Sequence, residues 1–75
     1  MNATTKQELS KTLETAIKQL KQAMKNIDKA EEIAFQNRKD EMSEGLKKDE
    51  IEVAKIADNL HILNCMVKYR MEDEQ

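Results

Sequence analysis

Cysteine and histidine each occur once in this chain, and they stand four residues apart at Cys65 and His61. On a helix, residues four apart are neighbours, so the imidazole could take the proton of the thiol and activate it as a nucleophile. That chemistry also needs an oxyanion hole and a cleft that excludes water, and the sequence contains no glycine-rich loop or other element that would build them. We therefore interpret Cys65 as a small buried apolar residue and His61 as a solvated surface residue.

The other polar residues give no further site. One cysteine cannot form a disulfide within the chain, and there is no cluster of cysteine and histidine for a metal. The adjacent carboxylates Glu31-Glu32 and Asp40-Glu41 are typical of solvated helix surfaces. We predict a protein that is not an enzyme, with no catalytic residue, no cofactor and no bound metal.

Composition and length predict one small domain built from long helices. Of the 75 residues, 37% are charged, one is glycine, none is proline and only Phe35 and Tyr69 are aromatic, so the turn residues that a β-fold requires are missing. A chain this short buries only about 60% of the surface of its unfolded state, so we expect a partner to add stability. The N-terminus lacks the apolar core of a secretory signal, and no run of about 18 apolar residues could span a bilayer. We expect a soluble, cytoplasmic protein.

The first helix is predicted over about residues 5–37. Thr5 and Glu8 have the spacing of a capping box, which favours a helix start at Thr5. From there, apolar residues recur in steps of four and three, which is typical of a coiled-coil stripe. The stripe consists of Leu9, Leu13, Ala16, Leu20, Ala23, Ile27, Ala30 and Ala34, flanked by Ile17 and Met24, and the opposite side carries Lys11, Lys18, Lys25 and Lys29.

The pattern lapses after Gln36, and we predict a turn within residues 38–48. Gly45 is the natural left-handed residue for the end of a helix. Asp49 and Glu52 then have the spacing of a second capping box, which predicts a second helix over about residues 49–72. The two helices should fold back on each other as an antiparallel all-α hairpin of coiled-coil type, a single domain over residues 1–75 that two copies could extend into a four-helix bundle.

The second helix is apolar on two opposite sides. At about 100° per residue, one side holds residues that we expect to pack against the first helix: Val53, Ile56, Ala57, Leu60, Leu63, Val67 and Met71. The other side, with Met66 at its margin, stays outside the hairpin, and such exposed apolar strips usually mark an interface. We predict that it binds a helical protein partner or a second copy of the chain; it consists of Ile51, Ala54, Ile62, Cys65, Met66 and Tyr69.

Nucleic acid is an alternative partner for the lysines of the first helix. Residues 1–30 carry a net charge of +3, whereas residues 31–75 carry −5. The opening Thr5-Lys6-Gln7-Glu8 resembles the start of small plasmid-encoded RNA-binding four-helix bundles. However, the lysine stripe contains no arginine and no interleaved aromatic residue to stack on bases, and the acidic second half would repel phosphate. Solvated helix faces explain these lysines better.

The tail ADNLHILNCMVKYR, residues 57–70, resembles the second helix of the small helical-hairpin co-chaperones of bacterial type III secretion systems, the YscE/SsaE type. Members of that family are of similar length, with a turn near mid-chain and an aliphatic run followed by Tyr and a basic residue. The resemblance implies a cytosolic chaperone or adaptor that pairs with a larger helical-repeat chaperone and keeps a needle or translocator subunit soluble. Ser43-Glu44-Gly45 stands where family members carry proline or glycine in the turn.

Overall fold

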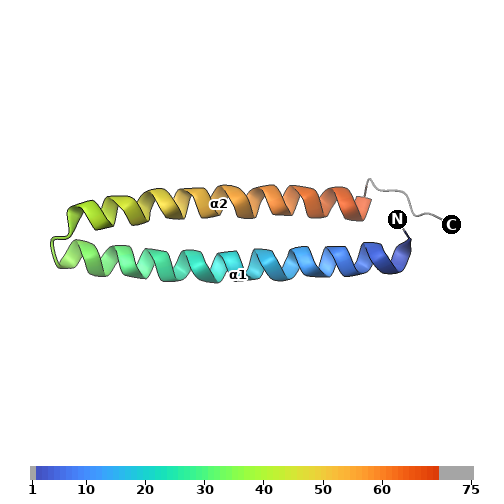
Figure 1. The fold of residues 1–75 in the computed structure, drawn as a ribbon, viewed down its shortest axis with the longest axis horizontal. Helices are drawn as coiled ribbons and strands as arrows, with labels where there is room; N and C mark the ends of the chain where they lie inside the picture. The colour runs from blue at the N-terminus through green and yellow to red at the C-terminus, as the bar shows by residue number, and fades with distance from the viewer. Residues whose placement is uncertain (1, 70–75) are drawn as a thin grey trace.

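Two long antiparallel helices make up the fold in the computed structural model, which describes residues 2–69 (Figure 1). Helix α1 spans Ala3–Gln36 and helix α2 spans Asp40–Tyr69. They lie side by side along their whole length, and the Cα atoms extend over 59 × 14 × 11 Å. No strand occurs in the described part of the chain. The predicted fold class, an all-α two-helix hairpin, is confirmed.

Helix α1 begins two residues earlier than the sequence suggested. Asn2 has an extended backbone, and its side-chain oxygen accepts a hydrogen bond from the Thr5 amide at 2.8 Å. Asparagine is among the best residues for this N-cap position because its short side chain satisfies an amide that the helix leaves unpaired. The predicted capping box from Thr5 to Glu8 is therefore wrong, and both residues lie inside the helix.

The turn is a Schellman motif that closes on an arginine. The amide of Lys39 donates to the carbonyl of Ala34 at 2.8 Å, and the amide of Arg38 donates to the carbonyl of Phe35 at 3.1 Å. These two bonds satisfy carbonyls at the end of α1. Arg38 has φ 57°, the left-handed conformation that glycine usually supplies at this position and that costs another residue about 1–2 kcal/mol.

Helix α2 begins at Asp40, so the predicted start at Asp49 is wrong. The turn comprises residues 37–39 and lies at the beginning of the range predicted for it, residues 38–48. Residues 37–39 suffice to reverse the chain, because Arg38 adopts the conformation that the prediction reserved for Gly45. Asp40 and Glu41 lie in the first turn of α2, where the helix dipole favours carboxylates. Gly45 lies inside α2. The predicted helix end at residue 72, and Met71, lie outside the described residues.

The contact between α1 and α2 follows the a and d positions of an antiparallel coiled coil. We name these positions the seam, and every one of them is buried or half-buried. The seam consists of Ser10, Leu13, Ile17, Leu20, Met24, Ile27, Glu31 and Ala34 on α1, and of Ser43, Leu46, Glu50, Val53, Ala57, Leu60, Asn64 and Val67 on α2.

The seam differs from the apolar faces that the sequence suggested. Ile56 and Leu63 were expected to face α1 but are 51% and 41% exposed, and Ala54 was expected outside but is half-buried. On α1, Ala30 is exposed and Ile17 is buried. The reason is that several seam positions hold polar residues. A search for apolar residues alone passes over those positions and shifts the inferred face of α2 towards Ile56 and Leu63.

A buried hydrogen bond crosses the seam near the open end of the hairpin. The Ser10 hydroxyl donates to the side-chain oxygen of Asn64 at 2.8 Å, and both residues are buried. A polar residue at an a position penalises other pairings, because a shifted register would leave it without a partner. This pair therefore fixes the alignment of α1 against α2.

Replacing Asn64 with alanine should leave the Ser10 hydroxyl buried without this partner and lower the free energy of unfolding by about 1–3 kcal/mol. Urea unfolding followed by circular dichroism measures the change. The double variant Ser10→Ala/Asn64→Leu should recover most of the loss, because no polar group is then stranded. Gln22→Ala, which removes an exposed side-chain amide from α1, is the matched control, and an equal loss in both single variants would contradict the assigned role.

Gly45→Ala should raise the free energy of unfolding by about 1 kcal/mol, because glycine in a helix interior loses more backbone entropy than alanine. The added methyl group meets no atom within 4 Å, so no steric cost opposes the gain. The measurement is again urea unfolding. A destabilised variant would mean that residue 45 is not helical in solution and that the chain turns there.

Candidate partner-binding surfaces

The residues predicted to bind a partner lie along the outside of α2, and we name them the outer strip. All of them except Ala54 are exposed, with Tyr69 at 81% and Ile62 at 59%. Ala54 is half-buried beside α1. The outer strip consists of Ile51, Ala54, Ile62, Cys65, Met66 and Tyr69.

The last two turns of α2 gather four of these side chains around one shallow hollow. Ile62, Cys65, Met66 and Tyr69 line it together with His61. Ile51 precedes Ile62 by eleven residues, or about 16 Å along a helix at 1.5 Å per residue, and does not belong to this group. Four residues of the outer strip are therefore grouped near Tyr69, whereas Ile51 lies apart from them.

Cys65 is an exposed free thiol. Its interpretation as a small buried residue is therefore wrong for the hairpin by itself. His61 is also exposed, as expected, and it lines the outer hollow as well as a second hollow between the helices.

A second exposed surface lies on one broad side of the hairpin, at the c and g positions that flank the seam. We name it the low-charge face, because only Asp49 and Glu52 carry a charge there, whereas 37% of the whole chain is charged. It consists of Leu9, Thr12, Ala16, Gln19, Ala23, Asn26, Ala30 and Ile33 on α1, and of Met42, Gly45, Asp49, Glu52, Ile56, Asn59, Leu63 and Met66 on α2.

Both helices contribute to this face. Near the turn, Ala30 and Ile33 of α1 and Met42 of α2 line a common apolar hollow. Ile33, Met42 and Ile56 are each more than half exposed. The sequence prediction missed this surface, although the distribution of charge along α1 indicates it. No lysine or acidic residue occupies its c and g positions from Leu9 to Ile33, because the lysines keep to the other sides of the helix.

The opposite broad side of the hairpin is charged. Lys68 pairs with Glu14 across the two helices at 2.7 Å, and Lys47 pairs with Glu31 at 3.7 Å. The hydrogen bond from Lys68 holds the pKa of the Glu14 carboxyl below its ordinary value. Both pairs are partly open to water, so each adds little stability. Each of them links α1 to α2 on this side of the hairpin.

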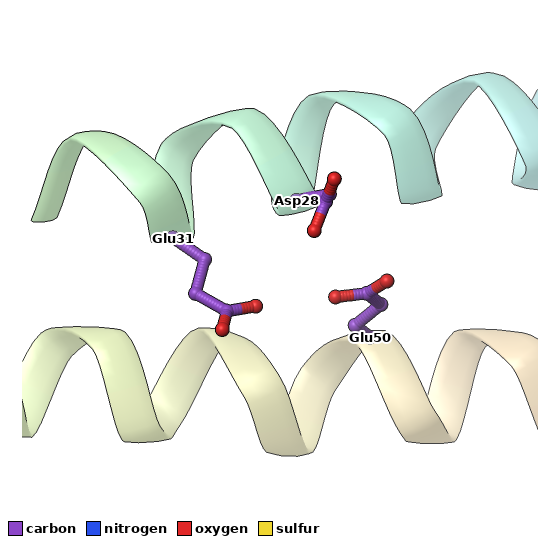
Figure 2. A group of neighbouring side chains, drawn as sticks. All are labelled: Asp28, Glu31 and Glu50. Carbon is purple, nitrogen blue, oxygen red and sulfur yellow. The ribbon is translucent and has the colours of Figure 1, made fainter. Parts of the chain in front are cut away.

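Three carboxylates meet on this charged side and form an acidic cluster. Asp28 and Glu31 come from α1 and Glu50 comes from α2, and Figure 2 shows their side chains turned towards one another between the helices. One oxygen of each lies within 4.8 Å of the others. A divalent cation favours such oxygens, but exposed acidic groups are common in proteins without an ion. We interpret the cluster as an electrostatic feature of the hairpin.

The pKa of the Glu50 carboxyl lies above its ordinary value. The largest cause is the loss of water around this half-buried side chain, followed by repulsion from Asp28 and Glu31. Lys47 opposes the effect. At neutral pH the ionised Glu50 carboxylate therefore works against closure of the hairpin.

The lysines predicted as the alternative nucleic-acid site lie on the outside of α1. Lys11, Lys18, Lys25 and Lys29 are all exposed. Lys25 lines a hollow together with Asp28 and Glu50 of the acidic cluster. These carboxylates weaken the attraction of the lysines for phosphate.

Comparison with protein-family models, with curated proteins and with solved structures finds no match for this chain. Within residues 2–69, neither helix has an apolar stretch that would allow it to cross a membrane.

Glu50→Gln should raise the melting temperature at pH 7 and make no difference at pH 4. A carboxyl whose pKa is raised on folding destabilises the folded state as the pH rises above its ordinary value of 4.5, and this cost is absent below that value. The loss of the Glu14–Lys68 pair in acid affects both proteins equally. Melting curves followed by circular dichroism at the two pH values provide the test. Glu44→Gln, at an exposed site of α2 outside the acidic cluster, is the control, and an equal effect in both variants would exclude the cluster as the cause.

Proposed function

We propose that this chain is a non-enzymatic adaptor or chaperone that binds a helical protein partner through the outer strip of α2. The observation that carries the proposal is the grouping of Ile62, Cys65, Met66 and Tyr69 around one hollow on the outside of the hairpin. An amphipathic partner helix binds in this way, with large side chains entering a shallow apolar groove.

The individual residues suit this role. Tyr69 offers a large apolar ring with a polar tip, and aromatic residues of this kind often dominate binding energies at interfaces. Met66 has a flexible, polarisable side chain that adapts to an irregular partner surface. Both stand at the exposed end of α2, where a partner can reach them without opening the seam.

The sequence resemblance of residues 57–70 suggests which kind of partner this is. In the proposed role the chain pairs in the bacterial cytosol with a helical-repeat chaperone of a type III secretion system and helps to keep a needle or translocator subunit soluble. A subunit that polymerises through amphipathic helices needs those helices covered before export, and a stable hairpin with an apolar outer strip can contribute to that cover.

Ile62→Glu should weaken binding to such a chaperone at least about a hundredfold, because a charge would be buried in the contact. The chain is co-expressed with candidate helical-repeat chaperones, and isothermal titration calorimetry measures the affinity of each complex. Ile62 is 59% exposed in the hairpin, so the helicity should not change.

Two controls make this test specific. Gln22→Glu adds the same charge to an exposed site on α1 and should leave the affinity unchanged. Lys18→Glu/Lys25→Glu should also have no effect on the complex. Retention of binding by Ile62→Glu would exclude the outer strip as the contact, and RNA binding that is lost in the lysine variant would favour the alternative of an RNA-binding bundle.

A further inference from the structure

The low-charge face has the composition of a protein interface. Interface centres are depleted of charged residues, and this face holds alanines, aliphatic residues, methionines and amides with only Asp49 and Glu52 as charges. The opposite broad side carries the ion pairs and the acidic cluster. The charged side is therefore well hydrated, whereas the low-charge face would gain from being covered.

The area of the face matches the requirement of a stable dimer. It covers residues 9–33 of α1, which extend over about 37 Å at 1.5 Å per residue, and its width is two helices of about 10 Å each. The resulting area of about 750 Å² is close to the roughly 800 Å² that each partner buries in a standard interface.

The two helices are complementary in size across this face. The g positions of α1 hold Ala16, Ala23 and Ala30, whereas those of α2 include Ile56 and Leu63. If α1 of one copy faces α2 of another, Leu63 meets Ala16 and Ile56 meets Ala23. Asp49 meets Ala30 near the turns. The opposite arrangement, with each helix facing its own copy, would place alanine against alanine and isoleucine against isoleucine.

The same arrangement gives the Glu52 carboxylate a polar neighbour in the other copy. Contacts between Ser10 and Asn64 and between Glu31 and Lys47 set the register of the hairpin. That register places Glu52 near the level of Asn26 on the neighbouring helix. With α1 facing α2 of the other copy, the amide of Asn26 lies opposite Glu52, so an uncharged hydrogen-bonding group meets the carboxylate.

We propose that a second copy of this chain covers the low-charge face and that the two hairpins form a four-helix bundle with both turns at the same end. The contact is isologous: α1 of each copy packs on α2 of the other, around a two-fold axis parallel to the helices. Apart from Met66, which belongs to both surfaces, the outer strip lies outside this contact, so the proposal does not rest on the proposed function and can fail or hold independently of it.

Sedimentation equilibrium and light scattering of the full chain test the dimer. Wild-type protein should be dimeric, with a melting temperature that rises with concentration over about two orders of magnitude. Ile56→Glu should raise the dimer dissociation constant at least about a hundredfold. Because Ile56 is 51% exposed in the hairpin, the change removes little packing within one copy.

Gln22→Glu is the matched control, since it adds the same charge outside the low-charge face and should leave the dimer intact. A wild-type chain that is monomeric and fully helical would overturn the proposal. So would a dimer that survives Ile56→Glu but dissociates in Ile62→Glu, because the contact would then lie on the outer strip.

Disulfide trapping tests the arrangement of the two copies. Chains carrying Cys65→Ser with Ala23→Cys are mixed with chains carrying Cys65→Ser with Ile56→Cys and then oxidised, because the register of the hairpin places Ala23 and Ile56 at the same level. The proposed arrangement predicts mainly disulfides between the two kinds of chain. Disulfides within each kind would overturn the arrangement and favour a bundle with the turns at opposite ends.

Discussion

The single seam between α1 and α2 determines how much apolar surface the hairpin can bury and how much stays exposed. Its buried apolar residues are few, namely Ile17, Ala34, Ala57 and Val67, and no large side chain is fully enclosed among the described residues. Two helices offer each other only one contact line, so they cannot surround a core as three or four helices can. The apolar residues that the seam does not take remain on the outside, which is why the hairpin has candidate binding surfaces but no enclosed site.

Polar residues in the seam reduce the apolar area that the two helices bury, but they define the alignment of α1 against α2. The bond between Ser10 and Asn64 adds less stability than packed leucines would, but it is lost in any shifted pairing. At the other end, Glu50 meets Asp28 and Glu31 across the helices and works against closure at neutral pH. A hairpin built in this way gains from any contact that holds α1 and α2 together from outside.

The sequence predicted the helices, their antiparallel pairing and the exposure of most of the outer strip, because these follow from heptad spacing and from a surplus of apolar residues on α2. It placed the start of the second helix nine residues too late within the broad range allowed for the turn, because Arg38 adopts a conformation that propensity assigns to glycine and Gly45 lies inside α2. It missed the low-charge face because that surface is marked by the absence of charge rather than by a run of large apolar residues such as Ile56.

The two candidate surfaces meet at Met66 but otherwise lie on different sides of the hairpin, and this bears on how they would work together. In a bundle where α1 of each copy packs on α2 of the other, the two α2 helices are diagonal, and their outer strips face opposite directions. A single partner helix could not contact both strips at once, so the dimer would gain no avidity from them. It would instead carry two independent sites and stabilise α2 beneath each one, since dimerisation adds packing at Ile56 and Leu63 that one hairpin does not provide.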